Sequence, residues 1–150
     1  MRTIDGIDGL RASVGQELGV SEWQQIDQSQ ISAFADSTGD QYWIHTDPER
    51  ASQTPMGSTI AHGLLTLSLG PMLSYEIYEI TGFEMYLNYG FGKVRFTAPV
   101  PVGSRVRMRA TLESITEVSG GINCTITQVF ELEGSERPAC VAESLIRIVS

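Results

Sequence analysis

Residues 64–80 of the chain are LLTLSLGPMLSYEIYEI, the longest mostly apolar segment in the sequence. It is apolar on nearly all sides, and no Asp, Glu, Lys or Arg occurs between Ala51 and Tyr75. A helix that is hydrophobic all round must be buried on most sides, so the stretch predicts a helix at the centre of the protein. Gly70 and Pro71 predict a kink or a short break inside that helix.

The sequence after this helix changes to a period of two residues. Apolar and polar residues alternate over 105–112 and 122–132, with Gln128 out of phase. This alternation is typical of strands with one wet face. Residues 84–96 and 139–149 predict two further strands. The fold class predicted is therefore α+β, with an antiparallel sheet packed against the long buried helix.

The first half of the chain predicts shorter elements. Residues 7–17 show a weak amphipathic helical pattern, Trp23–Ile26 predict a short strand, and residues 29–37 predict a second helix. Asp47 is a good N-cap for a third helix that has proline at its first position. No internal repeat or low-complexity linker appears, and we expect residues 1–150 to form a single domain.

Composition and charge exclude several classes of function. The chain is 41% hydrophobic and 19% charged, which is an ordinary globular balance. A net charge of -8 opposes non-specific nucleic-acid binding, because a phosphate backbone is held by a surplus of Lys and Arg. Half of the ten Lys and Arg residues lie within 93–109, where there is no acidic residue. That stretch could contact a phosphorylated small molecule.

The cysteine content and the N-terminal sequence indicate the cellular compartment in which the protein is expected. Cys124 and Cys140 are too few for a disulfide scaffold or a Cys-rich zinc site, and we expect both to be buried apolar residues. The N-terminal residues carry acids where a signal peptide needs a continuous apolar stretch, and no segment is apolar enough to span a membrane. The expected location is the cytoplasm.

A carboxylate and an imidazole lie five positions apart in one predicted loop. Asp40 follows Gly39 at the end of the second helix, and His45 comes two residues before the Asp47 cap. Such a pair can hold and deprotonate a water molecule. A purely structural interpretation remains open here, in which Asp40 is a turn residue and His45 an ordinary loop histidine.

A second polar element, Ile60-Ala61-His62-Gly63-Leu64, stands directly before the buried helix. The N–H of Gly63 would lie at the helix N-terminus, where unpaired N–H groups stabilise a developing oxyanion such as a thioester enolate. The alternative is that Gly63 only lets the chain turn into the helix and that His62 caps it.

Three ordered motifs resemble one known family. FADSTGDQYWIHTDPERA at 34–51, GSTIAHGLLTLSL at 57–69 and KVRFTAPVPVGSRV at 93–106 look like the MaoC-like dehydratase family, whose members include (R)-specific enoyl-CoA hydratases of hot-dog fold. The resemblance implies a single hot-dog fold, with the sheet wrapped around the long helix. Many family members have Asn and Pro where this chain has Tyr42 and Trp43.

The resemblance also implies roles for particular residues. In the family, the Asp and His that match Asp40 and His45 hold and activate the water added to an enoyl thioester. The N–H of the glycine that matches Gly63 polarises the thioester carbonyl. The implied reaction is reversible hydration of a trans-2-enoyl-CoA to an (R)-3-hydroxyacyl-CoA, which needs neither a metal nor a cofactor. A homodimer is also implied, because a single hot-dog sheet leaves its edges uncovered.

Substrate contacts follow from these expectations. Leu64 and Tyr86 are candidates for the wall of an acyl tunnel, and Lys93 and Arg95 are candidates to meet the phosphates of coenzyme A. Two other functions stay open: a hot-dog acyl-CoA thioesterase, and a non-catalytic subunit that only binds acyl thioesters. Thiol release would identify the first, and binding without turnover the second.

Overall fold

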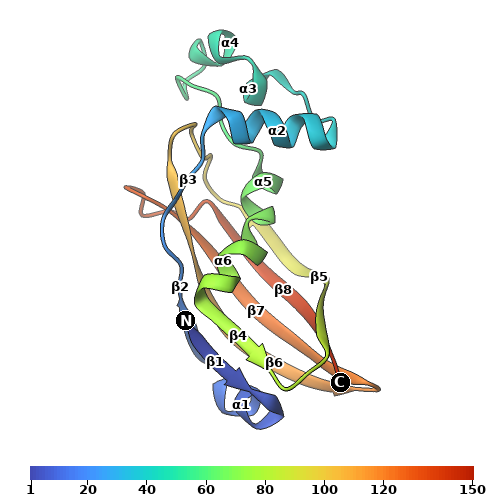
Figure 1. The fold of residues 1–150 in the computed structure, drawn as a ribbon. Coiled ribbons are helices and arrows are strands. Elements are labelled where there is room, and N and C mark those ends of the chain that lie inside the picture. Colours follow the sequence, from blue (N-terminus) through green and yellow to red (C-terminus); the bar gives the residue numbers. More distant parts are fainter.

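The main sheet of the computed structural model, which describes residues 1–150, has five long strands paired in antiparallel fashion. Their spatial order is β2-β6-β7-β8-β5, and the short strand β3 also pairs with β6. The bounds are β2 (Gln16–Val20), β3 (Gln24–Gln25), β5 (Met85–Phe96), β6 (Arg105–Val118), β7 (Gly121–Leu132) and β8 (Cys140–Val149). Figure 1 shows the strands running side by side beneath the central helices.

One face of this sheet is buried and the other is partly exposed, as the period of two predicts. In β6 the buried side chains are Val106, Met108, Ala110 and Leu112. In β7 the buried face includes Gln128, which pairs with Ala110 on one side and with Ala142 on the other. The prediction that Gln128 is out of phase was therefore wrong. Its position is in phase, and only its polarity is unusual.

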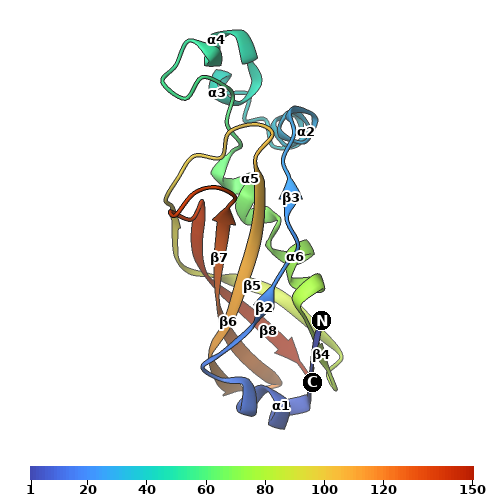
Figure 2. The ribbon, with the colours of Figure 1, turned by 90° about the vertical axis from the view of Figure 1, so that its left-hand side faces the viewer.

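The central helix lies on the buried face in two segments, α5 (Gly63–Ser68) and α6 (Gly70–Ile77). The predicted break at Gly70 and Pro71 is confirmed, because α6 starts there with proline in its first turn. Figure 2, turned by 90°, shows this helix on one side of the sheet. We predicted that the helix would continue to Ile80, which is wrong.

The chain instead becomes extended at Tyr78, where strand β4 (Tyr78–Thr81) begins. It pairs in parallel with β1 (Arg2–Asp5) in a separate two-stranded sheet. The partner strand lies more than 70 residues earlier in the chain, so no local pattern indicates the pairing. Backbone N–H and C=O groups that a longer helix would have used are bonded to β1 instead.

Helix α1 (Gly6–Ser13) is shorter than the predicted 7–17, because Gly15 adopts a φ of 78° and turns the chain into β2. Helix α2 (Gln28–Thr38) is confirmed, with Asp27 as its N-cap and Gly39 as its left-handed C-cap. Two short helices follow, α3 (Trp43–Thr46), which was not predicted, and α4 (Pro48–Ser52). Asp47 caps α4 as predicted.

Helices α2, α3 and α4 gather at one end of the sheet, and α1 lies at the opposite end (Figures 1 and 2). The N-terminus of α5 lies at the end of the sheet next to α2. No helix is both long and apolar enough to cross a membrane. The predicted burial of Cys124 and Cys140 is confirmed, and burial raises the pKa of each thiol to about 11.

Ion pairs cover the partly exposed face of the sheet. Arg105 pairs with Glu133 at 2.9 Å, and Arg109 contacts both Glu17 and Glu131. Burial by itself would raise the pKa of Glu131, but hydrogen bonds from Arg107 and Arg109 lower it below its usual value. These arginines are therefore neutralised by neighbouring acids on the face that turns away from the central helix.

The packing of α6 predicts that substitutions at Met72 and Leu73, which are adjacent, change the free energy of unfolding by different amounts. Leu73 is fully buried, whereas Met72 is 42% exposed. We expect Leu73→Ala to lower the free energy of unfolding by about 2–5 kcal/mol, because it leaves a cavity under the helix. Met72→Ala should cost less than about 1 kcal/mol. Urea denaturation measures both, and equal losses would contradict the assigned face of α6.

Candidate active site

Asp40 lies just beyond the C-terminus of α2, where the left-handed Gly39 turns the chain. The side chain is held in a local turn, since its Oδ1 accepts a hydrogen bond from the N–H of Tyr42 at 3.4 Å. The backbone N–H of Asp40 in turn donates to the hydroxyl of Thr38. The carboxylate is about half exposed, so it can meet a bound molecule.

His45 lies in α3 and is oriented by the backbone. Its Nδ1 is 2.7 Å from the carbonyl oxygen of Ile60, which can only accept a hydrogen bond. In the neutral ring the proton is therefore on Nδ1, and Nε2 keeps a free lone pair. Gln28 of α2 donates from its amide to the carbonyl of His45 at 2.9 Å, so α2 holds α3 in place.

His62 is a third member of this cluster, and the sequence interpretation missed it. We considered it only as a helix cap, but its side chain makes no capping hydrogen bond. The ring is 3% exposed, and its Nε2 lies 3.1 Å from the backbone carbonyl of Asp40 and 3.9 Å from the carboxylate. The signal for it was present in the sequence, because the His62-Gly63 pair directly precedes the central helix.

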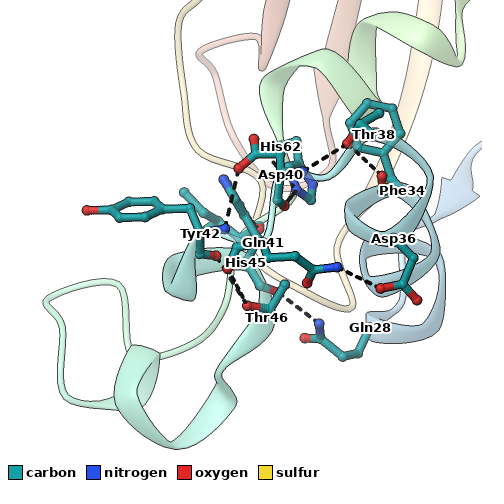
Figure 3. Close-up of polar contacts among 11 residues, drawn as sticks. Gln28, Phe34, Asp36, Thr38, Asp40, Gln41, Tyr42, His45, Thr46 and His62 are labelled. Carbon is teal, nitrogen blue, oxygen red and sulfur yellow. Dashed lines mark hydrogen bonds and ion pairs between the residues drawn. The ribbon is translucent and has the colours of Figure 1, made fainter.

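Figure 3 shows Asp40, His45 and His62 drawn together from three different segments, with the ring of Tyr42 directed away from them. The two imidazoles are stacked, with centroids 3.9 Å apart and planes inclined by 23°. Phe34 packs on His62 at a centroid distance of 4.9 Å. His62 thus holds both the loop of Asp40 and the ring of His45.

The same three residues have the composition of a metal site. One ligand atom of each lies within 4.8 Å of the others. A metal ion must lie in the plane of each imidazole at about 2.1 Å from its nitrogen. Two stacked planes that differ by only 23° do not meet that close to both rings. The geometry therefore fits a hydrogen-bonding site better than a single metal ion held by both histidines.

Gly63 completes the cluster at the first position of α5. Its N–H has no carbonyl partner within the helix, since the first N–H groups of any helix lack one. A Cβ at this position would lie 2.7 Å from the ring of Phe96, so a larger residue would push the helix start away from β5. Glycine is needed here for close approach.

These groups share one cavity of about 340 Å³. Asp40, His45, His62, Gly63 and Leu64 all contribute to its lining. Two buried polar atoms of lining residues have no hydrogen-bond partner, the Nδ1 of His62 and the hydroxyl oxygen of Thr66. The cavity thus contains a carboxylate, an imidazole nitrogen and a free backbone N–H around apolar walls.

Three of the other residues predicted from sequence lie outside this cavity. Tyr86 lines a second cavity farther along the central helix. Lys93 and Arg95 lie on β5 and line neither of these cavities. Arg95 pairs with Val141, the position next to the buried Ala142, so the register turns Arg95 toward the opposite face of the sheet. Phosphate binding by Lys93 and Arg95 stays a prediction.

Comparison with known families identifies the chain. The family described as MaoC like domain matches residues 10–133. The chain belongs to the MaoC-like dehydratase family. The resemblance inferred from the three sequence motifs is thereby confirmed, and with it the hot-dog fold.

Curated relatives of this MaoC-like dehydratase include proteins of similar length. The 3-hydroxyacyl-thioester dehydratase Z of Mycobacterium tuberculosis is 48% identical over 151 residues, which cover 100% of both chains. Nodulation protein N of Rhizobium leguminosarum is 46% identical over 132 residues, covering 86% of this chain and 82% of the relative. With the family match, the full-length similarity to the dehydratase places the chain among the hydro-lyases.

Solved structures support the same fold. The unliganded R-hydratase PhaJ1 of Pseudomonas aeruginosa superposes with a TM-score of 0.74 at 20% identity, covering 91% of this chain and 82% of that one. An (R)-hydratase from A. caviae gives a TM-score of 0.73 at 24% identity, with coverages of 89% and 94%. At such identities the likeness concerns the fold alone.

The hydrogen bonds of the site predict opposite tautomers for the only two histidines of the chain. At neutral charge we expect His45 to carry its proton on Nδ1, bonded to Ile60, and His62 to carry its proton on Nε2, bonded to Asp40. Nitrogen-15 NMR of the imidazoles distinguishes the two forms, and His45→Gln assigns the signals. A proton on Nε2 of neutral His45 would contradict this geometry.

Proposed function

We propose that this MaoC-like dehydratase catalyses the reversible hydration of trans-2-enoyl-CoA to (R)-3-hydroxyacyl-CoA. The observation that carries the proposal is the convergence of Asp40, His45 and the N–H of Gly63 on one cavity. A full-length relative with 48% identity that is named a 3-hydroxyacyl-thioester dehydratase supports the thioester substrate. The (R) configuration rests on the family resemblance.

A water molecule fits between the two side chains. Ligand atoms of Asp40 and His45 lie within 4.8 Å of each other, a gap that two hydrogen bonds of about 2.8 Å meeting at one water can span. The carboxylate of Asp40 accepts a proton from this water as its oxygen attacks the β-carbon. The free Nε2 of His45 accepts the second hydrogen bond and orients the water. The proton is returned to the α-carbon, so one water is added.

The N–H of Gly63 stabilises the charge that develops on the thioester oxygen. Attack at the β-carbon moves electrons onto this oxygen and makes it enolate-like. A single donor in such a position contributes about 3–4 kcal/mol to catalysis. Because Gly63 has no side chain, its N–H is reachable from the cavity beside Phe96.

Coenzyme A is the carrier that the charge of the protein favours. At a net charge of -8 the surface would repel an acidic carrier protein. Leu64 at the cavity is placed to contact the acyl chain near the thioester, and Tyr86 is placed to contact it farther along the helix. Lys93 and Arg95 are the candidates for the phosphates of coenzyme A.

The test is the conversion of crotonyl-CoA by the purified protein. We expect the absorbance of the conjugated enoyl thioester to fall without release of free thiol. Asp40→Asn and His45→Gln should each lower the rate by about 10²–10⁴-fold, because each removes one partner of the water. Glu49→Gln, at an exposed position of α4, is the control and should keep full activity.

Other outcomes point to the alternatives. Release of free thiol would overturn the proposal in favour of an acyl-CoA thioesterase. Binding of enoyl-CoA substrates of every length without turnover would favour a non-catalytic binding subunit.

We also propose that the chain forms a homodimer through β5. This strand lies at the edge of the sheet, and its free edge offers unpaired backbone groups. Its large apolar side chains are unusually exposed: Met85, Tyr86, Leu87, Tyr89, Phe91 and Phe96 are each 46–60% exposed. Pairing with β5 of a second copy would satisfy the backbone and cover these side chains.

Light scattering during gel filtration measures this directly. We expect twice the chain mass of 16.4 kDa for the unmodified protein and the mass of one chain for Leu87→Lys, since a charge would be buried at the interface. Val14→Lys, at an exposed apolar position away from β5, is the matched control and should stay dimeric. A monomeric unmodified protein, or a dimer that resists Leu87→Lys, would contradict a β5 interface.

A further inference from the structure

The second cavity lies between the central helix and the sheet, and the chemical step described above takes place outside it. Its volume is about 360 Å³. The floor is formed by Gln128 of β7 and Ser144 of β8, and Tyr78 and Asn88 are among the polar wall residues. A cavity under the helix of this fold would be expected to be apolar, because it lies within the hydrophobic layer.

The polar groups of the floor are buried and unused. Gln128 is 4% exposed and Ser144 is 5% exposed. Neither side chain takes part in a hydrogen bond within the chain, although both line the cavity. Polar atoms that face a cavity and have no partner in the chain can form hydrogen bonds to whatever enters it. This pair is therefore available to a molecule that enters the cavity.

Small residues surround the side chain of Gln128. Its neighbours across the sheet are Ala110 on β6 and Ala142 on β8, both fully buried. Above it lies Gly70, where an added Cβ would be 3.2 Å from the Oε1 of Gln128. The helix break at Gly70 and Pro71 thus sits directly over the amide. A larger residue at Gly70 would press on the Gln128 amide.

The lining carries no charged group. It contains no Lys, Arg, His, Asp or Glu. Tyr78 stays neutral as well, because burial raises its pKa to about 12. The amide of Gln128 can donate and accept, as can the hydroxyl of Ser144. The groups that such a lining recognises are neutral oxygen-bearing groups, and a carboxylate or an ammonium group would be buried without a counter-charge.

The second cavity lies next to the candidate active site along the central helix. In this part of the chain the first cavity is lined by His62, Gly63, Leu64 and Thr66, and the second by Leu67, Ser68, Pro71, Ser74, Tyr75 and Tyr78. Strand β5 contributes to both, with Phe96 at the first and Phe91 at the second. Gly70 lies seven residues after Gly63, so the Gln128 amide is roughly 10 Å along the helix from the Gly63 N–H. An acyl chain whose carbonyl meets Gly63 would lead toward Gln128.

We infer that the preferred acyl group carries a neutral oxygen-bearing substituent, a hydroxyl or a keto group, toward its far end, and that Gln128 and Ser144 bind this substituent. The inference rests on the proposed hydration reaction and names the class of its substrate. Gln128 and Ser144 act here as specificity-determining residues and take no part in the chemistry.

The test compares trans-2-octenoyl-CoA with its terminally hydroxylated and terminal keto derivatives. For the unmodified protein we expect kcat/KM to be at least about tenfold higher for one of the oxygenated substrates, and which of the two is faster identifies the group. Gln128→Leu should abolish this preference and raise kcat/KM for the plain octenoyl chain. Thr127→Val, the adjacent position on the outer face of β7, should leave the preference unchanged.

Two further measurements keep the outcomes distinct. Crotonyl-CoA is too short to reach Gln128, so its hydration reports on the proposed reaction alone, and Thr127→Val should leave its rate unchanged. Thermal unfolding of Gln128→Leu should show no loss of stability, because the amide has no partner to lose. Hydration of crotonyl-CoA together with a preference for the plain octenoyl chain would overturn the inference, and so would a strongly destabilised Gln128→Leu.

Discussion

The burial of α5 and α6 against one face of the sheet is the constraint on which the rest of the structure depends. The helix is exposed on one side, at Leu64, Met72 and Tyr75, so the expected burial on most sides was too strong. Its other side is apolar and buried, and the alternating strands supply the face that covers it. Because α5 begins at Gly63 against the ring of Phe96, this packing also fixes where the free N–H of the helix lies. Both cavities lie beside the same helix, so the packing of that helix in the core determines where the candidate site lies.

The polar cluster shows how distant segments are brought to that helix start. Asp40 follows α2, His45 sits in α3, and His62 directly precedes α5. They are joined through backbone carbonyls rather than through a direct pairing of side chains, since His45 bonds to Ile60 and His62 bonds to Asp40. Backbone acceptors impose one tautomer on each ring, which leaves Nε2 of His45 and the Asp40 carboxylate free for substrate and water.

The small size of two glycines on the central helix shapes its surroundings as much as the chemistry of the polar residues does. Gly63 allows β5 and the helix start to approach each other, whereas Gly70 leaves room for the Gln128 amide beneath the helix break. The first glycine exposes a hydrogen-bond donor at the reacting end. The second keeps a polar floor open farther along. A single helix thereby borders two chemically different cavities.

Local patterns in the sequence determined the elements whose signals are short-range: the buried central helix with its break at Gly70, the alternating strands, the Asp47 cap, and the Asp40, His45 and Gly63 motifs that resemble the family. Only the tertiary structure decided the features that depend on pairing between distant segments. The helix ends at Ile77 because β4 pairs with β1, and His62 joins the site because its buried ring meets Asp40 and His45. Gln128 illustrates the same limit, because its polarity is visible in the sequence, but its small neighbours Ala110, Ala142 and Gly70 come from three other segments. Hydrophobic period and capping are properties of neighbouring residues, whereas cavities and buried hydrogen bonds arise only when the core has formed.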